Sequence, residues 1–187
     1  SIACRAPALA DLEGDGDVEV IVEGGILNGK DGTLKKAFPT GVSIPSVSDL
    51  DGDGKLDITN GHLAYRADAT LLADSTHPSS WSAVGDLDKD GKPEIVGINP
   101  STGSRRMHIW RVKAGAPGDE VVRQPFDIHE TAPSNPCGHT AGGGPPTIAD
   151  FNGDGTPDVA LAGSIAYVIF DGKKLMDPTV ASKDTLL

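Results

Sequence analysis

The chain has 187 residues, enough for one domain with a buried core, and a formal net charge of −11. Its 24 Gly and 14 Pro suit a fold with many tight turns, and no run approaches the roughly 18 apolar residues of a membrane span. No long helical periodicity is present, so the composition favours an all-β domain and argues against a membrane-embedded one. No signal-peptide pattern begins at Ser1, and we expect either a mature chain or a segment of a longer protein.

In chain order, short apolar runs occur in four pairs, and each pair is interrupted by an acidic loop. The first runs of the pairs are Pro7–Ala10, Pro45–Ser48, Trp81–Gly85 and Pro146–Ala149, and the second runs are Val18–Val22, Leu56–Ile58, Glu94–Val96 and Asp158–Leu161. The runs are short, rich in β-branched residues and bounded by Gly or Pro, which is typical of strands. We therefore predict four pairs of antiparallel strands, each joined by its acidic loop.

Each acidic loop is a copy of a nine-residue pattern, which is clearest in Asp49–Asp57 (DLDGDGKLD). Side chains with oxygen atoms fall at positions one, three, five and nine, and Gly stands at position six. Calcium takes six to eight oxygen ligands, and short Asp side chains at alternate positions can converge on one ion. Position seven varies in type, as expected of a residue that ligates through its backbone carbonyl.

We number the copies loop 1 to loop 4 and expect each to bind one ion, which gives up to four Ca²⁺. The expected ligands are Asp11, Glu13, Asp15, the Asp17 carbonyl and Glu19 in loop 1; Asp49, Asp51, Asp53, the Lys55 carbonyl and Asp57 in loop 2; Asp86, Asp88, Asp90, the Lys92 carbonyl and Glu94 in loop 3; and Asp150, Asn152, Asp154, the Thr156 carbonyl and Asp158 in loop 4. The loops hold 16 of the 27 acidic residues, so we interpret the acidity as a local ligand requirement.

Two other families with such loops do not fit the residues that follow. An EF-hand needs a bidentate Glu at position twelve between flanking helices, but position twelve is Val22, Asn60, Gly97 or Leu161. A dockerin-like module would continue into an amphipathic helix, whereas strand-like runs follow here. The pattern P-x-x-x-D-Φ-D-G-D-G-x-x-D-Φ, where Φ is apolar, instead resembles the FG-GAP repeat, also called the VCBS-type repeat, over nearly the whole chain.

The resemblance implies a β-propeller built from four-stranded blades. Successive loops begin 38, 37 and 64 residues apart, and the first two distances are close to the roughly 40 residues of a blade. We expect blades near residues 1–40, 41–78, 79–127 and 145–177, an inserted loop at 128–144 and a tail at 178–187, with the last strand of the fourth blade at Lys173–Met176. FG-GAP propellers usually close with about seven blades, so we favour a segment of a longer protein. Packing against another copy or chain, and an unusually small closed propeller, stay open as alternatives.

The resemblance also implies a function and a location. FG-GAP proteins are typically exported, so we expect a secreted or cell-surface module that recognises or adheres to a protein or glycan. The inserted loop is the best candidate for recognition, because binding concentrates in long loops on rigid scaffolds. Neither nucleic-acid binding nor membrane insertion is expected. Two alternatives remain: a propeller domain of a secreted polysaccharide-degrading enzyme, and a structural component of a surface assembly.

The two cysteines, Cys4 and Cys137, have two interpretations. In an exported protein they can form a disulfide between the first strand and the inserted loop. They can also be unrelated thiols or pair outside this chain. His129 and His139 flank Cys137, but loop histidines are more often solvated than bound to a soft metal.

Motifs of catalysis are absent from the sequence, and we predict no catalytic residue and no enzyme activity. The chain has no Gly-x-Ser-x-Gly elbow, no His-Glu-x-x-His pair and no phosphate-binding loop. His62, His77 and His108 show no spacing typical of metal ligands. Trp81 and Trp110 stand at strand positions, where an aromatic residue more often belongs to the core than to a sugar-stacking platform.

Overall fold

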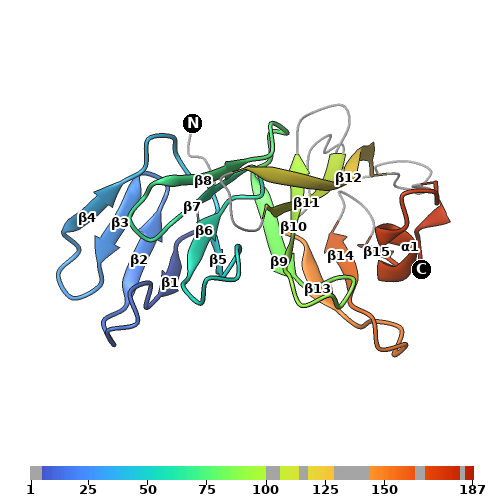
Figure 1. Cartoon of the computed structure of the whole chain (residues 1–187), viewed down its shortest axis with the longest axis horizontal. Coiled ribbons are helices and arrows are strands. Elements are labelled where there is room, and N and C mark those ends of the chain that lie inside the picture. The colour runs from blue at the N-terminus through green and yellow to red at the C-terminus, as the bar shows by residue number, and fades with distance from the viewer. Residues whose placement is uncertain (1–5, 100–105, 114–117, 129–143, 163–166, 182–183) are drawn as a thin grey trace.

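The fold is all-β, as predicted, and the computed structural model describes residues 6–99, 106–113, 118–128, 144–162, 167–181 and 184–187. Its strands form four antiparallel sheets that follow one another along the long axis of the molecule (Figure 1). Within each sheet, neighbouring strands are consecutive in the chain, so every sheet is a simple meander. The first and fourth sheets lie at opposite ends, so the four sheets form an open row.

The first two sheets have four strands each. The first contains β1 (Ala8–Ala10), β2 (Glu19–Val22), β3 (Gly25–Asn28) and β4 (Leu34–Ala37). The second contains β5 (Ser46–Ser48), β6 (Asp57–Thr59), β7 (Leu63–Tyr65) and β8 (Leu71–Asp74). In both, the first and second strands are antiparallel partners across the acidic loop, which confirms this part of the prediction.

The third sheet also has four strands, and the fourth has three. The third contains β9 (Trp81–Gly85), β10 (Glu94–Asn99), β11 (Arg106–Val112) and β12 (Asp119–Asp127). The fourth contains β13 (Thr147–Ala149), β14 (Asp158–Ala162) and β15 (Tyr167–Phe170). The predicted pairs across loops 3 and 4 are again present.

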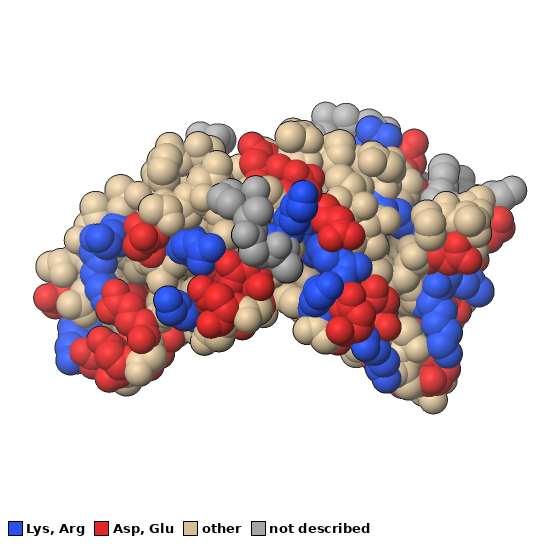
Figure 2. Space-filling view, viewed as in Figure 1, with Lys and Arg blue, Asp and Glu red and all other residues tan. Residues whose placement is uncertain are grey.

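The first strands of successive sheets lie next to one another, which places all four acidic loops along one edge of the molecule. β1 contacts β5, β5 contacts β9, and β9 contacts β13. Because each loop leaves the same end of its first strand, the loops lie on the lower side in Figure 1. The same edge carries clusters of red acidic side chains with blue basic side chains among them in Figure 2.

The end of the chain differs from the prediction. Lys173–Met176 was predicted as a strand, but Gly172–Met176 forms the short helix α1. Asp171 caps this helix, because its side chain accepts a hydrogen bond from the Lys174 N–H at 3.1 Å. Gly172 lets the first residue of the helix lie against the backbone of Pro157, since a Cβ at this position would collide with the Pro157 carbonyl oxygen.

The tail takes the place of a fourth strand beside β15. Leu186 forms an antiparallel bridge with Phe170, and the Leu187 N–H donates to the Ile169 carbonyl at 3.0 Å. The Asp171 N–H likewise donates to the Thr185 carbonyl at 2.7 Å. The tail, which carries no repeat signal in the sequence, therefore covers the outer edge of the fourth sheet.

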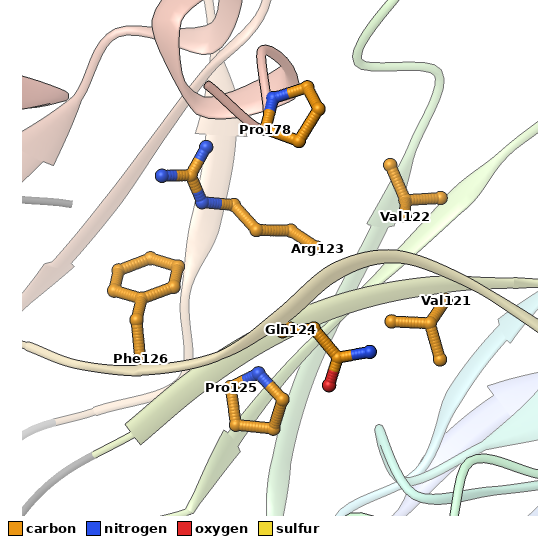
Figure 3. Close-up of a pocket in the computed structure, with 7 residues that line it drawn as sticks. All are labelled: Val121, Val122, Arg123, Gln124, Pro125, Phe126 and Pro178. Atoms are coloured by element: carbon orange, nitrogen blue, oxygen red, sulfur yellow. The ribbon is translucent and has the colours of Figure 1, made fainter. Parts of the chain in front are cut away.

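Arg123 of β12 ties the third sheet to the helix and tail. Its guanidinium donates to the carbonyls of Leu175, Asp177 and Val180 at 2.7, 2.8 and 2.7 Å, and to that of Lys174 at 3.4 Å. The residue is buried and also lies over the ring of Phe126 (Figure 3). A hollow of about 320 Å³ lies beside it, lined by β12 and Pro178, and both Nη atoms of this arginine already donate to carbonyls.

Three apolar clusters hold the sheets together, one at each contact between neighbouring sheets. The cluster between the first and second sheets includes Ile21, Ile26 and Tyr65; that between the second and third includes Leu72, Ile95 and Trp110; and that between the third and fourth includes Val96, Val159 and Phe170. Burying one such side chain contributes roughly 1.5–3 kcal/mol. Trp110 is fully buried and donates through Nε1 to the Gly61 carbonyl at 2.9 Å, so it is a core residue, as we favoured.

One apolar row on the first sheet has no sheet packed over it in the described part of the chain. Leu9, Val20, Leu27 and Leu34 are register partners from β1 to β4, and Leu9 and Leu34 are 68% and 61% exposed. Val20 occupies position ten after its loop. The position-ten residues of the other sheets, Ile58, Ile95 and Val159, are fully buried against the preceding sheet. The face of the first sheet that carries Val20 therefore corresponds to the face by which each later sheet packs against the sheet before it, but no described sheet covers it.

A buried histidine lies at the junction of the second and third sheets. His108 of β11 has its Nε2 3.3 Å from the Ser75 hydroxyl and its Nδ1 3.4 Å from the Ser79 hydroxyl. Its ring packs edge-on against that of His77, with the centroids 5.3 Å apart. Burial, and then the charge of His77, lower the pKa of His108 to about 4 from its usual 6.5.

We therefore expect the protein to become less stable in acid because His108 is protonated more readily in the unfolded state than in the folded state. The folded state keeps the imidazole neutral, so the unfolded state binds an extra proton as pH falls from 6.5 towards 4, and stability decreases over that window. The loss should reach about 2 kcal/mol at pH 5. Denaturant unfolding of the wild type and His108→Gln at pH 7 and pH 5, in excess calcium, measures it. An equal loss in both proteins would assign the acid sensitivity to other groups.

Candidate metal sites

The four acidic loops share one pattern of hydrogen bonds, although their sequences differ. The carboxylate at position one accepts the N–H of position six, and the distances in loops 1 to 4 are 2.8, 2.9, 3.0 and 2.8 Å. The carboxylate at position five accepts the N–H of position seven at 2.9, 2.9, 2.8 and 2.8 Å. Each loop is therefore wound around its own carboxylates in the same way.

The acid at position nine is the most buried acid of every loop. Glu19, Asp57, Glu94 and Asp158 are all no more than 2% exposed. Each accepts the N–H of position two, at 3.0, 3.1, 2.7 and 3.0 Å in loops 1 to 4. One oxygen of this carboxylate thus fixes the start of the loop to the start of the second strand.

The winding requires left-handed backbone at two positions. Position six is Gly in all four loops, with φ between 84° and 90°. Position four also has positive φ, and it is Gly in three loops and Lys89 (φ 62°) in loop 3. Gly at position six is part of the sequence pattern, whereas the left-handed backbone at position four was not predicted.

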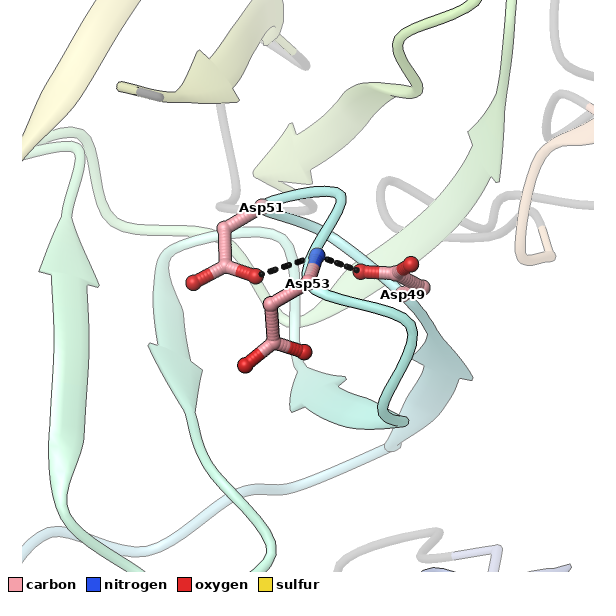
Figure 4. A group of neighbouring side chains, drawn as sticks. All are labelled: Asp49, Asp51 and Asp53. Atoms are coloured by element: carbon pink, nitrogen blue, oxygen red, sulfur yellow. Dashed lines mark hydrogen bonds between the residues drawn. The ribbon is translucent and has the colours of Figure 1, made fainter. Parts of the chain in front are cut away.

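In loops 2 and 3 the structure brings three predicted ligands together. In each, the carboxylates at positions one, three and five offer oxygens that all lie within 4.8 Å of one another. Figure 4 shows the set in loop 2, where the Asp53 N–H donates to both Asp49 and Asp51 at 3.2 Å. These oxygens converge as expected of ligands of one hard cation.

Loops 1 and 4 depart from this arrangement at position three. In loop 1 the longer Glu13 turns to Lys35, with its Oε2 3.0 Å from Nζ. In loop 4 position three is Asn152, whose amide oxygen accepts the Asp154 N–H at 2.8 Å. Asn152 therefore keeps an oxygen at this position but supplies no charge.

Basic side chains from later elements reach the carboxylates of every loop, a feature that sequence reasoning missed. Lys35 of β4 contacts Glu19 at 2.8 Å, and Lys173 of α1 contacts Asp154 at 2.8 Å. In loops 2 and 3 the partner is an arginine of the third strand or just after it, Arg66 or Arg111. The shared signal in the sequence is an aromatic residue followed by Arg, in Tyr65-Arg66 and Trp110-Arg111.

These contacts and the burial shift the pKa values of several loop acids. Burial raises the pKa of Asp57 to about 6 and that of Glu94 to about 7. The Gly16 N–H lowers the pKa of Asp11, and hydrogen bonds from Arg111 and Lys173 lower those of Asp90 and Asp154. Asp57 and Glu94 are thus costly to ionise in the protein alone, whereas Asp11, Asp90 and Asp154 are held charged.

The residues of loop 3 fit a divalent cation on independent grounds. Asp86 Oδ1 and Glu94 Oε1 are buried and accept no hydrogen bond, although Arg111 Nη2 lies 3.4 Å from Glu94 Oε1. Buried polar atoms are normally hydrogen-bonded, so the Asp86 oxygen lacks a partner that a cation would supply. All-oxygen donors of this kind suit calcium or magnesium rather than a soft metal.

Some predicted features cannot be placed. Cys4, Cys137, His129 and His139, together with most of the inserted loop at 128–144, lie outside the described residues. The proposed carbonyl ligands at position seven, Asp17, Lys55, Lys92 and Thr156, are in the described part, and each N–H is engaged as above. None of the helices in the described part of the chain has the length and apolar character needed to cross a membrane.

Comparisons with known proteins give the fold and no family. No protein-family model matches the chain, and no curated protein matches it either. Among solved structures, it is similar to the V. cholerae biofilm matrix protein Bap1, with 23% sequence identity and a TM-score of 0.53. The match covers 60% of this chain and 19% of that one, so the chain spans only a small part of the length of Bap1. At this identity the similarity shows the fold alone.

Proposed function

We propose that this chain is a calcium-binding module of FG-GAP type, in which ions in the loops between first and second strands stabilise propeller-like blades. The observation that carries the proposal is the recurrence of one carboxylate-centred winding in four loops, with a buried Asp86 oxygen in loop 3 that accepts no hydrogen bond. When bound, a calcium ion would supply positive charge to carboxylates that otherwise repel one another. Two carboxylates about 4 Å apart repel by roughly 4 kcal/mol at an effective dielectric constant near 20.

The first test separates side-chain ligands from the carbonyl ligand within loop 2. Asp53→Ala should abolish calcium binding by this loop, because it removes a carboxylate that converges with Asp49 and Asp51. Lys55→Ala should leave the affinity within about twofold, since position seven is proposed to act through its backbone. Calorimetric titration of metal-free protein measures both. Equal losses in the two variants would contradict the assignment of position seven.

We further propose that the module works outside the cell, secreted or at the cell surface, in recognition of or adhesion to a protein or glycan. Two features support this: calcium is plentiful there, and the fold resembles part of a biofilm matrix protein. A binding assay tests this recognition role. The purified chain is applied to immobilised matrix polysaccharide and to a protein-coated surface, with calcium and with chelator, and its retention is measured. Retention on neither surface in calcium would contradict recognition and would favour a purely structural role.

A catalytic role in polysaccharide degradation is the second candidate, and it needs basic and acidic groups that face one cleft outside the loops. The hollow beside Arg123 does not provide them among its described residues. Its lining contains no carboxylate, and the guanidinium is engaged by backbone carbonyls. We therefore favour the binding module, in which the blades carry no catalytic residue.

A further inference from the structure

The arginines beside loops 2 and 3 occupy the same place in their sheets. Tyr65 pairs with Ile58, the position-ten residue of its sheet, and Trp110 pairs with the corresponding Ile95. Arg66 and Arg111 each follow that aromatic residue, so they are register equivalents. In the first and fourth sheets the equivalent residues are Asn28 and Asp171, as the pairs Val20–Leu27 and Val159–Phe170 show.

In loop 2 the Arg66 guanidinium donates to the carboxylate oxygens that accept no backbone N–H. Asp51 and Asp53 use their Oδ1 atoms to accept N–H groups of the loop, at 3.2 and 2.9 Å. Their Oδ2 atoms accept hydrogen bonds from Arg66 instead, at 2.9 and 3.3 Å. The arginine therefore binds the oxygens at positions three and five that remain for a cation.

Loop 3 repeats this contact with a more buried arginine. Arg111 donates to Asp90 Oδ2 at 2.8 Å and Asp88 Oδ2 at 3.3 Å, and its Nη2 lies 3.4 Å from Glu94 Oε1. Its side chain is 12% exposed, compared with 40% for Arg66. A hollow of about 190 Å³ lined by Lys55, Asp57 and Arg66 opens beside loop 2, so the Arg66 side chain has space to withdraw.

We propose that Arg66 and Arg111 are built-in counter-cations that compete with the divalent ion and set its affinity in loops 2 and 3. This inference rests on the proposed calcium function. The arginine neutralises the carboxylates when no ion is bound, and an incoming ion displaces it from the oxygens at positions three and five. Because ligand charge determines much of the calcium affinity of such loops, an engaged arginine lowers that affinity.

Calcium titrations followed by NMR resolve the two loops, because the amides of Gly54 and Gly91 report loops 2 and 3 separately. In Arg66→Gln, the Gly54 signal should respond at about tenfold lower calcium than in the wild type, while Gly91 responds as before. Arg66→Lys, which keeps the charge, should stay within threefold of the wild type. Lys36→Gln removes one exposed positive charge of β4 that acts on Asp68, outside the loops; it is the matched control and should also stay within threefold.

Melting temperatures distinguish the proposed competition from a merely structural role of Arg66. In chelator, Arg66→Gln should melt at a lower temperature than Lys36→Gln because its carboxylates have lost their counter-charge, and in excess calcium the two should melt together. A gain of calcium affinity below threefold in Arg66→Gln, or any loss, would overturn the competition. Absence of a calcium response at both Gly54 and Gly91 in the wild type would instead refute the proposed calcium function, and this inference with it.

Discussion

Chelation of calcium should lower the melting temperature of this protein by about 10–20 °C, and calcium should restore it far better than magnesium. An ion present at 100 times its dissociation constant stabilises the folded state by about 2.7 kcal/mol per site. Loops 2 and 3 alone, where three carboxylates converge, should thus contribute about 5 kcal/mol. In a chain of this size each kcal/mol corresponds to roughly 2–4 °C.

The metal-free protein should nevertheless remain folded at room temperature. Basic side chains, among them Lys35, Arg66 and Arg111, already offset part of the carboxylate repulsion. Magnesium requires a small, rigid octahedral shell and releases its water reluctantly, so the many oxygens of these loops suit it less well. Differential scanning calorimetry with chelator, calcium or magnesium measures the effect. An unchanged melting temperature in chelator would show that the ions are not structural.

Replacement of Arg123 by Met should destabilise the protein by about 3 kcal/mol, or roughly 6–12 °C in melting temperature. The guanidinium satisfies four carbonyls of α1 and the tail, and Met fills the same volume without donating a hydrogen bond. Hydrogen bonds from a charged group to buried carbonyls are among the stronger ones, and their loss removes the charged donor from the Leu175 and Val180 carbonyls, while those of Lys174 and Asp177 keep a backbone N–H.

Arg106→Met is the matched control for this substitution. Arg106 lies on the neighbouring strand β11, is about half exposed, and pairs with Asp127 at 3.3 Å. Surface ion pairs of this kind contribute little, so the control should cost less than about 1 kcal/mol. Equal effects of the two substitutions in denaturant unfolding would mean that Arg123 does not anchor the end of the chain.

The sequence by itself determined the features that depend on short stretches of chain. Short apolar runs bounded by Gly or Pro predicted the strand pairs around all four loops, and the nine-residue pattern predicted the carboxylates that converge in loops 2 and 3. Both signals are local: β-branched residues and flanking turn residues mark a strand within a few positions, and ligands at alternate positions of one loop need no partner elsewhere. Gly at position six was predictable for the same reason, because its backbone conformation is set within the loop.

Local reasoning was wrong about the end of the chain. Lys173–Met176 contains the residues of a plausible strand, yet Asp171 caps a helix there and Arg123, some 50 positions earlier, holds its carbonyls. The tail then occupies the edge that the expected strand would have filled. A competing long-range contact decided the outcome, and no window of sequence contains both partners.

Only the tertiary structure decided which basic residues meet which loops and which surfaces stay uncovered. Arg66 and Arg111 lie 13 to 23 positions from the carboxylates they contact, and strand register places them there. The same register leaves Leu9 and Leu34 exposed on the first sheet, whereas the counterparts of Val20 in the other sheets are fully buried. Pairing between strands aligns residues that are distant in the chain, so properties of neighbouring sheets follow from the register rather than from any local pattern.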